Sequence, residues 1–99
     1  MSFVSALPED LLATAADLRG VGDTVAAQSA AAAASTTGVI PAAADEVSAL
    51  TAAQFARHAQ MYQVISKRAA VVHEMFVKTL QHSAQSYAAT DAANVISVY

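Results

Sequence analysis

The sequence contains no cysteine and no tryptophan, and only three of its 99 residues are glycine and two are proline. Without cysteine the chain has neither a disulfide framework nor a thiol nucleophile. So little glycine and proline cannot supply the turns of an all-β sandwich. The short length allows one domain and excludes a multidomain enzyme. These absences favour a single helical domain.

Charged residues are also scarce, with five basic and eight acidic side chains and a net charge of −3. No basic run is present, so nucleic acid is not expected as a partner. Residues 1–46 carry six of the acids and one base, whereas the remainder carries four bases and two acids. A small domain normally covers its surface with charge. We therefore expect apolar surface that the chain itself does not cover.

Alanine, with 26 residues, is the most abundant amino acid and the best helix former, so the fold class is predicted to be all-α. Pro8 suits the first position of a helix. Ser35-Thr36-Thr37-Gly38 should end that helix, and Gly20 and Gly22 should make it locally irregular. A second helix should follow Pro41, with Asp45 as a plausible N-cap.

The predicted division is a helical hairpin over residues 1–84 and a C-terminal tail over residues 85–99. The first helix is expected over about 8–36 and the second over about 43–84. The small, polar residues of the tail leave open whether it is helical or frayed.

The second helix is apolar over roughly twice the arc of about 100° that one neighbouring helix can cover. The missing cover has to come from another chain, a membrane or self-association, and a four-helix bundle built from two hairpins is the simplest closure. The residues predicted to form the hairpin or partner interface are Leu11, Leu18, Val25, Phe55, His58, Met61, Tyr62, Ile65, Val72, Phe76 and Leu80.

No pattern indicates catalysis, a cofactor or a metal. The histidines at 58, 73 and 82 lack the i, i+4 spacing of helical zinc sites. No nucleophile elbow, phosphate-binding loop or dinucleotide fingerprint is present. His58 lies near the centre of the apolar arc, where we expect it to be buried with a hydrogen-bond partner.

Neither the N-terminus nor the longest uncharged segment has the pattern of a Sec signal peptide or of a transmembrane helix. The first ten residues lack the basic and apolar regions of a Sec signal peptide. The longest uncharged stretch, residues 24–44, is mostly alanine with several polar residues, so no transmembrane segment is expected. Tyr87 and Asp91 stand four residues apart, which places them on one face of a helical tail.

Several segments, in this order, resemble the mycobacterial PE family, which is named for a Pro-Glu pair near its start. They are Met1-Ser2-Phe3-Val4 with Pro8-Glu9, residues 36–48 (TTGVIPAAADEVS), residues 52–55 (AAQF), residues 73–77 (HEMFV) and residues 86–91 (SYAATD). Together they cover essentially the whole chain.

The resemblance implies an antiparallel hairpin that pairs with a PPE-family protein in a heterodimeric four-helix bundle. It also implies export by a type VII secretion system, with Tyr87 and Asp91 matching the family's Tyr-x-x-x-Asp/Glu signal and the partner supplying a Trp-x-Gly turn. The expected route runs from the cytoplasm to the cell surface or medium, with a chaperone that contacts the PPE partner.

Two alternatives stay open. One is a self-associating hairpin with a structural role, and the other is an effector peripheral to the membrane or cell surface after export.

Overall fold

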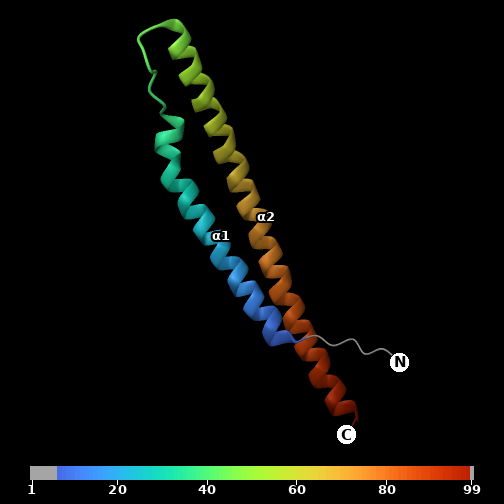
Figure 1. The fold of residues 1–99 in the computed structure, drawn as a ribbon. Coiled ribbons are helices and arrows are strands. Elements are labelled where there is room, and N and C mark those ends of the chain that lie inside the picture. Colours follow the sequence, from blue (N-terminus) through green and yellow to red (C-terminus); the bar gives the residue numbers. More distant parts are fainter. Residues whose placement is uncertain (1–6, 99) are drawn as a thin grey trace, which may run out of the picture.

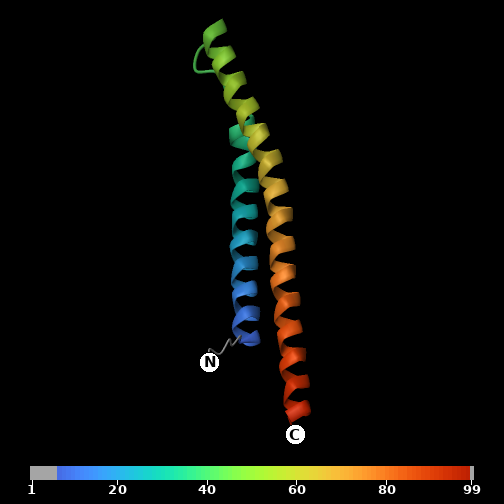
Figure 2. The same cartoon turned by 90° about the vertical axis from the view of Figure 1, so that its right-hand side faces the viewer.

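The chain folds as two long helices joined by a short connection. The computed structural model describes residues 7–98, with side chains up to residue 96. Helix α1 spans Pro8–Thr37 and helix α2 spans Glu46–Val98. The helices run antiparallel, side by side (Figures 1 and 2). The molecule measures 81 × 23 × 18 Å, so it is a rod rather than a globule. The predicted all-α hairpin is confirmed.

Helix α1 begins and ends at residues that the sequence marks. Pro8 occupies the first turn together with the acids Glu9 and Asp10, which favour the positive end of the helix dipole. At the other end, the Thr37 hydroxyl donates to the Ala33 carbonyl over 2.6 Å, and the Gly38 N–H donates to the Ala34 carbonyl. The irregularity expected at the two mid-helix glycines is not found, because α1 runs unbroken through both.

Helix α2 starts at a side-chain cap. The Asp45 carboxylate accepts a hydrogen bond of 2.7 Å from the backbone N–H of Ser48, which satisfies one of the free donors of the first turn. From Glu46 the helix continues without a break for 53 residues. At 1.5 Å per residue this amounts to about 80 Å. Helix α2 therefore sets the full length of the molecule.

Because α2 is the longer helix, its C-terminal end projects past the start of α1 (Figure 1). Ala84 is the last buried residue of the described chain, and every described side chain from residue 85 to residue 96 is exposed. The tail that the sequence left open as helical or frayed is therefore helical through Val98. We call residues 85–98 the overhang.

The contact between the helices is built mostly from small side chains. The α2 residues that turn toward α1 recur at spacings of four and three, as in a coiled coil. These inner residues are buried or half-buried: Ala52, Ala56, Ala59, Gln63, Ser66, His73, Val77, Leu80 and Ala84. On α1 the inner residues include Leu11, Ala15, Leu18, Gly22 and Ser29. Val77 is the one large side chain of the described residues that is fully buried, so the hairpin has only a thin core of its own.

Candidate partner interface

His73 joins the two helices in the half of the hairpin that contains the start of α1. Its Nε2 atom lies 2.6 Å from the Leu18 carbonyl oxygen, and because that oxygen can only accept, the Nε2–H group donates the hydrogen bond. The ring lies over Gly22, where an added Cβ would come within 2.7 Å of the His73 Cδ2 atom. Only glycine leaves room for the ring at this point. The group that approaches this glycine most closely is thus a side chain from the other helix.

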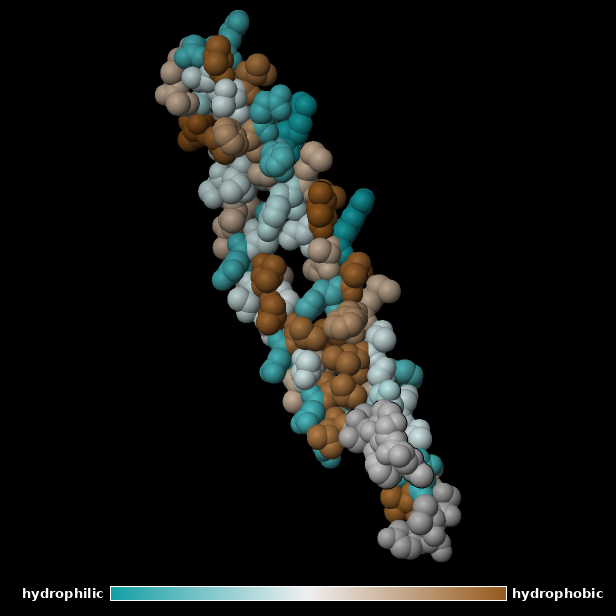
Figure 3. All heavy atoms as spheres, turned by 45° about the vertical axis from the view of Figure 1, so that its right-hand side comes forward, coloured by the Kyte–Doolittle hydropathy of each residue, from teal (hydrophilic) through white to brown (hydrophobic). Residues whose placement is uncertain are grey.

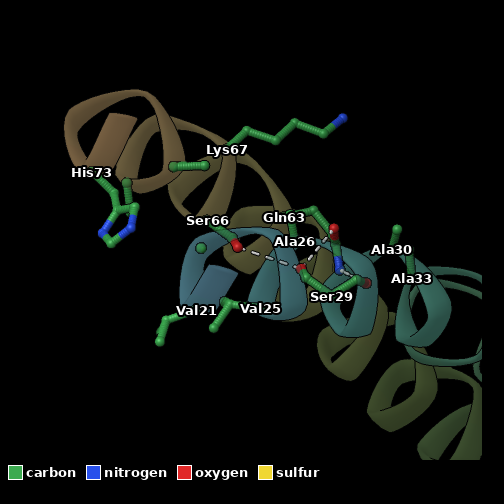
Figure 4. Close-up of a pocket in the computed structure, with 13 residues that line it drawn as sticks. Val21, Val25, Ala26, Ser29, Ala30, Ala33, Gln63, Ser66, Lys67 and His73 are labelled. Atoms are coloured by element: carbon green, nitrogen blue, oxygen red, sulfur yellow. Dashed lines mark hydrogen bonds between the residues drawn. The ribbon is translucent and has the colours of Figure 1, made fainter. Parts of the chain in front are cut away.

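A second polar cluster joins the middle of the helices (Figure 4). The Gln63 amide donates to the Ser29 carbonyl over 3.1 Å, and the Ser29 hydroxyl lies 3.4 Å from the Gln63 side-chain oxygen. The hydroxyls of Ser29 and Ser66 share a hydrogen bond of 3.3 Å. The hydrogen bonds of His73 and of this cluster therefore fix the position of one helix along the other, which alanine contacts alone would not define.

A cavity of about 580 Å³ lies between the helices beside this cluster. Its lining is mainly alanine and valine, including Val21, Val25 and Ala69, while Lys67 at its edge points away from it (Figure 4). The helices are therefore not fully packed against each other along their middle.

One broad side of the hairpin is apolar. Each large α2 residue on it directly precedes an inner residue, as Phe76 precedes Val77 and Ile65 precedes Ser66. Because the helices are antiparallel, residues that precede inner positions on either helix lie on the same side of the pair. The apolar face, as named here, comprises the residues that follow this rule, together with Val25, which lines the cavity beside them. Its seven members, all exposed, are Val21, Val25, Phe55, Tyr62, Ile65, Val72 and Phe76.

The opposite side is polar. It carries residues that directly follow inner positions, among them Asp23, Lys67 and Glu74. Lys78 and Glu74 form an exposed ion pair at 3.4 Å on this side. A second, smaller hollow there is lined by Arg19, Asp23 and Glu74. The hairpin thus has one side suited to water and one side that is not.

The interface residues predicted from sequence divide into two groups. Leu11, Leu18 and Leu80 are half-buried within the hairpin. Val25, Phe55, Met61, Tyr62, Ile65, Val72 and Phe76 are at least half exposed. Hydrophobic side chains accordingly appear on the surface along the hairpin and at its tip (Figure 3). The role of the second group in binding a partner stays a prediction.

The total exposed area supports the need for a partner. A compact monomer of 10.1 kDa exposes roughly 5,300 Å². The hairpin exposes 7863 Å². Its rod shape accounts for part of this excess, but the exposed side chains are those that normally form a core. This excess of exposed area is similar in size to the surface area that the chains of an obligate complex bury in their interface.

His58, which the sequence led us to expect buried with a hydrogen-bond partner, is exposed in the single chain. It lies beside a shallow hollow lined by Leu50, Thr51, Gln54 and Phe55. The centre of the apolar arc is not the side that meets α1, which explains the error. Among the described residues, His73 is the histidine with a hydrogen bond to the other helix. No three histidine or acidic side chains of these residues lie close enough together to bind a metal ion.

Tyr87 and Asp91 both lie on the overhang. Tyr87 is 50% exposed, and Asp91, one turn later on the same face, is exposed as well. The pair is therefore presented on a regular helix, after the last buried residue of α2. Over residues 7–98, neither helix has an apolar stretch that would cross a bilayer.

The profile of the PE family matches residues 4–94. The chain belongs to the PE family. PE family protein PE13 of Mycobacterium tuberculosis is 64% identical over 94 residues, which are 95% of this chain and 95% of that protein. PE-PGRS family protein PE_PGRS33 of the same species is 55% identical over 95% of this chain but only 20% of that protein. PE cleavage protein A is 51% identical over 93% of this chain and 16% of that protein.

The PE chain therefore resembles a whole protein in one relative and one part of much longer proteins in others. The Pro8-Glu9 pair stands at the first turn of α1, where proline and an acid both favour helix initiation. The Met1-Ser2-Phe3-Val4 segment of the resemblance lies outside the described residues.

Proposed function

We propose that this PE chain is the non-enzymatic half of an obligate heterodimer with a PPE-family protein, exported by a type VII secretion system. The observation that carries the proposal is the apolar face, which places seven aliphatic and aromatic side chains on one side of a hairpin that buries almost none of its large residues. A four-helix bundle with two partner helices is the simplest structure that covers this face.

The geometry of the pair suits such a partner. The apolar face runs from Phe55 to Phe76, which is about 32 Å of helix, and α1 contributes Val21 and Val25 beside it. The cavity that opens between the helices offers space for side chains of an opposing helix. A partner on this side leaves the polar face and its ion pair in water, as is usual for the rim of an interface.

The overhang supports the export part of the proposal. A signal read by secretion machinery has to stay accessible after the two chains have paired. Tyr87 and Asp91 meet that condition, because the overhang lies beyond the paired part of the hairpin. In this proposal the machinery reads these two residues together with the partner's turn, and the chaperone contacts the PPE partner.

The pairing is tested by producing the chain with and without a candidate PPE-family chain, followed by sizing and light scattering. The expected product of co-production is a soluble 1:1 complex. A homodimeric bundle of PE chains, the structural alternative, would show instead as a stable species of twice the chain mass that the PPE chain does not change. Such a species would contradict the heterodimer.

The export signal is tested with Tyr87→Ala in mycobacterial cells. We expect export into the medium to be lost while the complex still forms inside the cell, because Tyr87 is half exposed and follows the last buried residue of α2. Ser86→Ala, at the exposed neighbouring position, is the matched control and should be exported normally. Continued export of the Tyr87→Ala complex would show that this residue is not part of the signal.

A further inference from the structure

The cavity between the helices coincides with a layer of the hairpin that is not packed. On α1 the inner residues include Gly22 and then Ser29, and on α2 they include Ser66 and then His73. Each of these intervals is seven residues long, and a regular spacing of three and four predicts one further inner residue within it. The positions where that residue would lie are all exposed, namely Val25 and Ala26 on α1 and Ala69 and Ala70 on α2. One layer of contacts between the helices is therefore missing.

The two intervals lie at the same level of the rod. The His73 ring lies over Gly22 at one end, and the hydroxyls of Ser29 and Ser66 share a hydrogen bond at the other. Because the helices are antiparallel, the middle of one interval faces the middle of the other. The cavity of about 580 Å³ occupies this level, and all four exposed residues belong to its lining. The cavity is thus the space that the missing layer leaves.

A row of aromatic side chains on α2 is interrupted at the same level. Phe55, Tyr62 and Phe76 are separated by multiples of seven residues, so they form one line along the apolar face. Ala69 occupies the position in this line between Tyr62 and Phe76. The three aromatic side chains are between 56% and 64% exposed, whereas the alanine position provides only a methyl group. The surface offered to a partner is therefore raised at three positions and hollow at one.

The lining of the cavity indicates the chemistry of a group that fills it. The side chains of Ser29, Gln63 and Ser66 bond to one another, and no buried side-chain nitrogen or oxygen of the described residues lacks a partner. Lys67 points away from the cavity (Figure 4). The cavity therefore suits an apolar group. A dry cavity of about 150 Å³ already accepts a benzene ring, so this one has room for the largest side chains.

We propose that a large aliphatic or aromatic side chain of the partner helix inserts into this cavity beside Ala69 and completes the missing layer. The inference rests on the proposed function, because the chain that covers the apolar face supplies the inserted side chain. Val21 and Val25 belong both to that face and to the lining, so a helix on the face passes the cavity. Packed cores place large residues opposite small ones. The cavity thereby favours partner chains with a large residue at this level.

The test fills the cavity from within this chain. Ala69→Phe completes the aromatic row and places a ring in the space that the partner's side chain requires. The variant and a differently tagged wild-type chain are produced together with a limiting amount of the PPE chain. The ratio of the two tags in the purified complex measures relative pairing. We expect the variant to be under-represented about tenfold, because the cavity would be overpacked.

Ala53→Phe is the matched control. It is the same change at an exposed alanine that directly follows the inner residue Ala52, and therefore lies on the polar side of the hairpin. Its ratio to the wild-type chain should stay near one. Position 69 is exposed as well, so neither ring should prevent the hairpin from folding.

A change in the partner identifies the inserted side chain. The large apolar residues of the two partner helices are changed to alanine one at a time, and each variant is paired with Ala69→Phe. We expect one of these changes to restore pairing with Ala69→Phe and to weaken pairing with the wild-type chain. Such a reversal occurs only if the two groups compete for the same space.

Three results would overturn the insertion. Equal or preferred incorporation of Ala69→Phe would mean that the cavity stays empty in the complex, because filling a void is neutral or stabilising. An equal loss for Ala53→Phe would mean that any added ring disturbs pairing. A loss at position 69 that no partner change restores would mean that no side chain occupies the cavity. If the wild-type chain pairs normally in these experiments, only the insertion fails, whereas absence of wild-type pairing contradicts the proposed function as well.

Discussion

The side of α2 that packs against α1 and the apolar face beside it differ sharply in the size of their side chains. Val77 is 1% exposed and its neighbour Phe76 is 56% exposed. Toward α1 the helix presents mainly alanine and serine, with His73, Val77 and Leu80 between them, whereas on the apolar face it presents phenylalanine, tyrosine and isoleucine. A protein that folds alone has the reverse arrangement, with its large apolar side chains in its core. In the proposed heterodimer, the main core forms only when the partner chain is added.

The largest effect should follow a change on the apolar face. Phe76→Glu places a carboxylate where the proposed partner packs, and burying it without a counter-charge should weaken pairing about a hundredfold or more. Co-purification with the PPE chain measures this. Gln60→Glu, on the polar face, is the matched control and should pair normally. Equal pairing by both variants would mean that the apolar and polar sides have been wrongly assigned.

The next effect concerns the two glycines of α1, which have the same helix propensity but different neighbours. An alanine at position 22 collides with the His73 ring, whereas one at position 20 meets nothing within 4 Å. Gly22→Ala should therefore leave the complex about 2 kcal/mol less stable than Gly20→Ala does. Thermal unfolding of the two variant complexes gives the difference. Equal stability would show that the His73 contact with the Leu18 carbonyl contributes nothing.

A smaller effect is expected from the polar cluster of the inner side. Ser29→Ala removes the hydroxyl that contacts Gln63 and Ser66, at a cost of about 1 kcal/mol, because the bonds are only partly shielded from water. Ser86→Ala on the overhang should leave the stability unchanged. Chemical denaturation of both variant complexes provides the comparison. A larger loss at position 86 would contradict the view of the overhang as a separate segment.

The smallest effect belongs to the polar face. Lys78→Ala breaks the ion pair with Glu74, but both side chains are more than 60% exposed, so the free energy of unfolding should change by less than about 0.5 kcal/mol. Thermal unfolding in low and high salt checks this. A loss of several kcal/mol would indicate that a partner buries this side as well.

The fold follows from signals that act over short distances. Pro8 begins α1, Gly38 follows its end and Asp45 caps α2, because helix ends depend on neighbouring backbone and side-chain groups. The chain between Glu46 and Val98 contains neither proline nor glycine, which accounts for its unbroken helix.

The orientation of α2 could not be derived in the same way. Apolar side chains lie on most of its circumference, so periodicity does not tell which side meets α1. That side is chosen by small size, by Ala59 and Ser66 rather than by Phe55 or Ile65. For this reason the expectation for His58 was wrong, and the pairing of His73 with Gly22 was missed. A heptad of small residues on both helices was the available signal: residues 15, 22 and 29 on one helix and residues 52, 59 and 66 on the other, with His73 at the next heptad position.

Tyr87 and Asp91 lie in the part of α2 that follows its last buried residue, Ala84. The sequence indicated where α1 begins but left the form of the tail open. The spacing of Tyr87 and Asp91 acquires a structural meaning only because α2 continues as a helix beyond the last contact at Ala84.

The central claim, that the hairpin is half of a bundle, is tested most directly by comparing thermal unfolding of the chain alone with that of the chain in complex with a PPE-family partner. Circular dichroism and light scattering follow helix content and size together. We expect the complex to unfold in one cooperative transition and the lone chain to associate or to lose its helices gradually. A monomeric lone chain that unfolds as cooperatively as the complex, at the same temperature, would contradict the account.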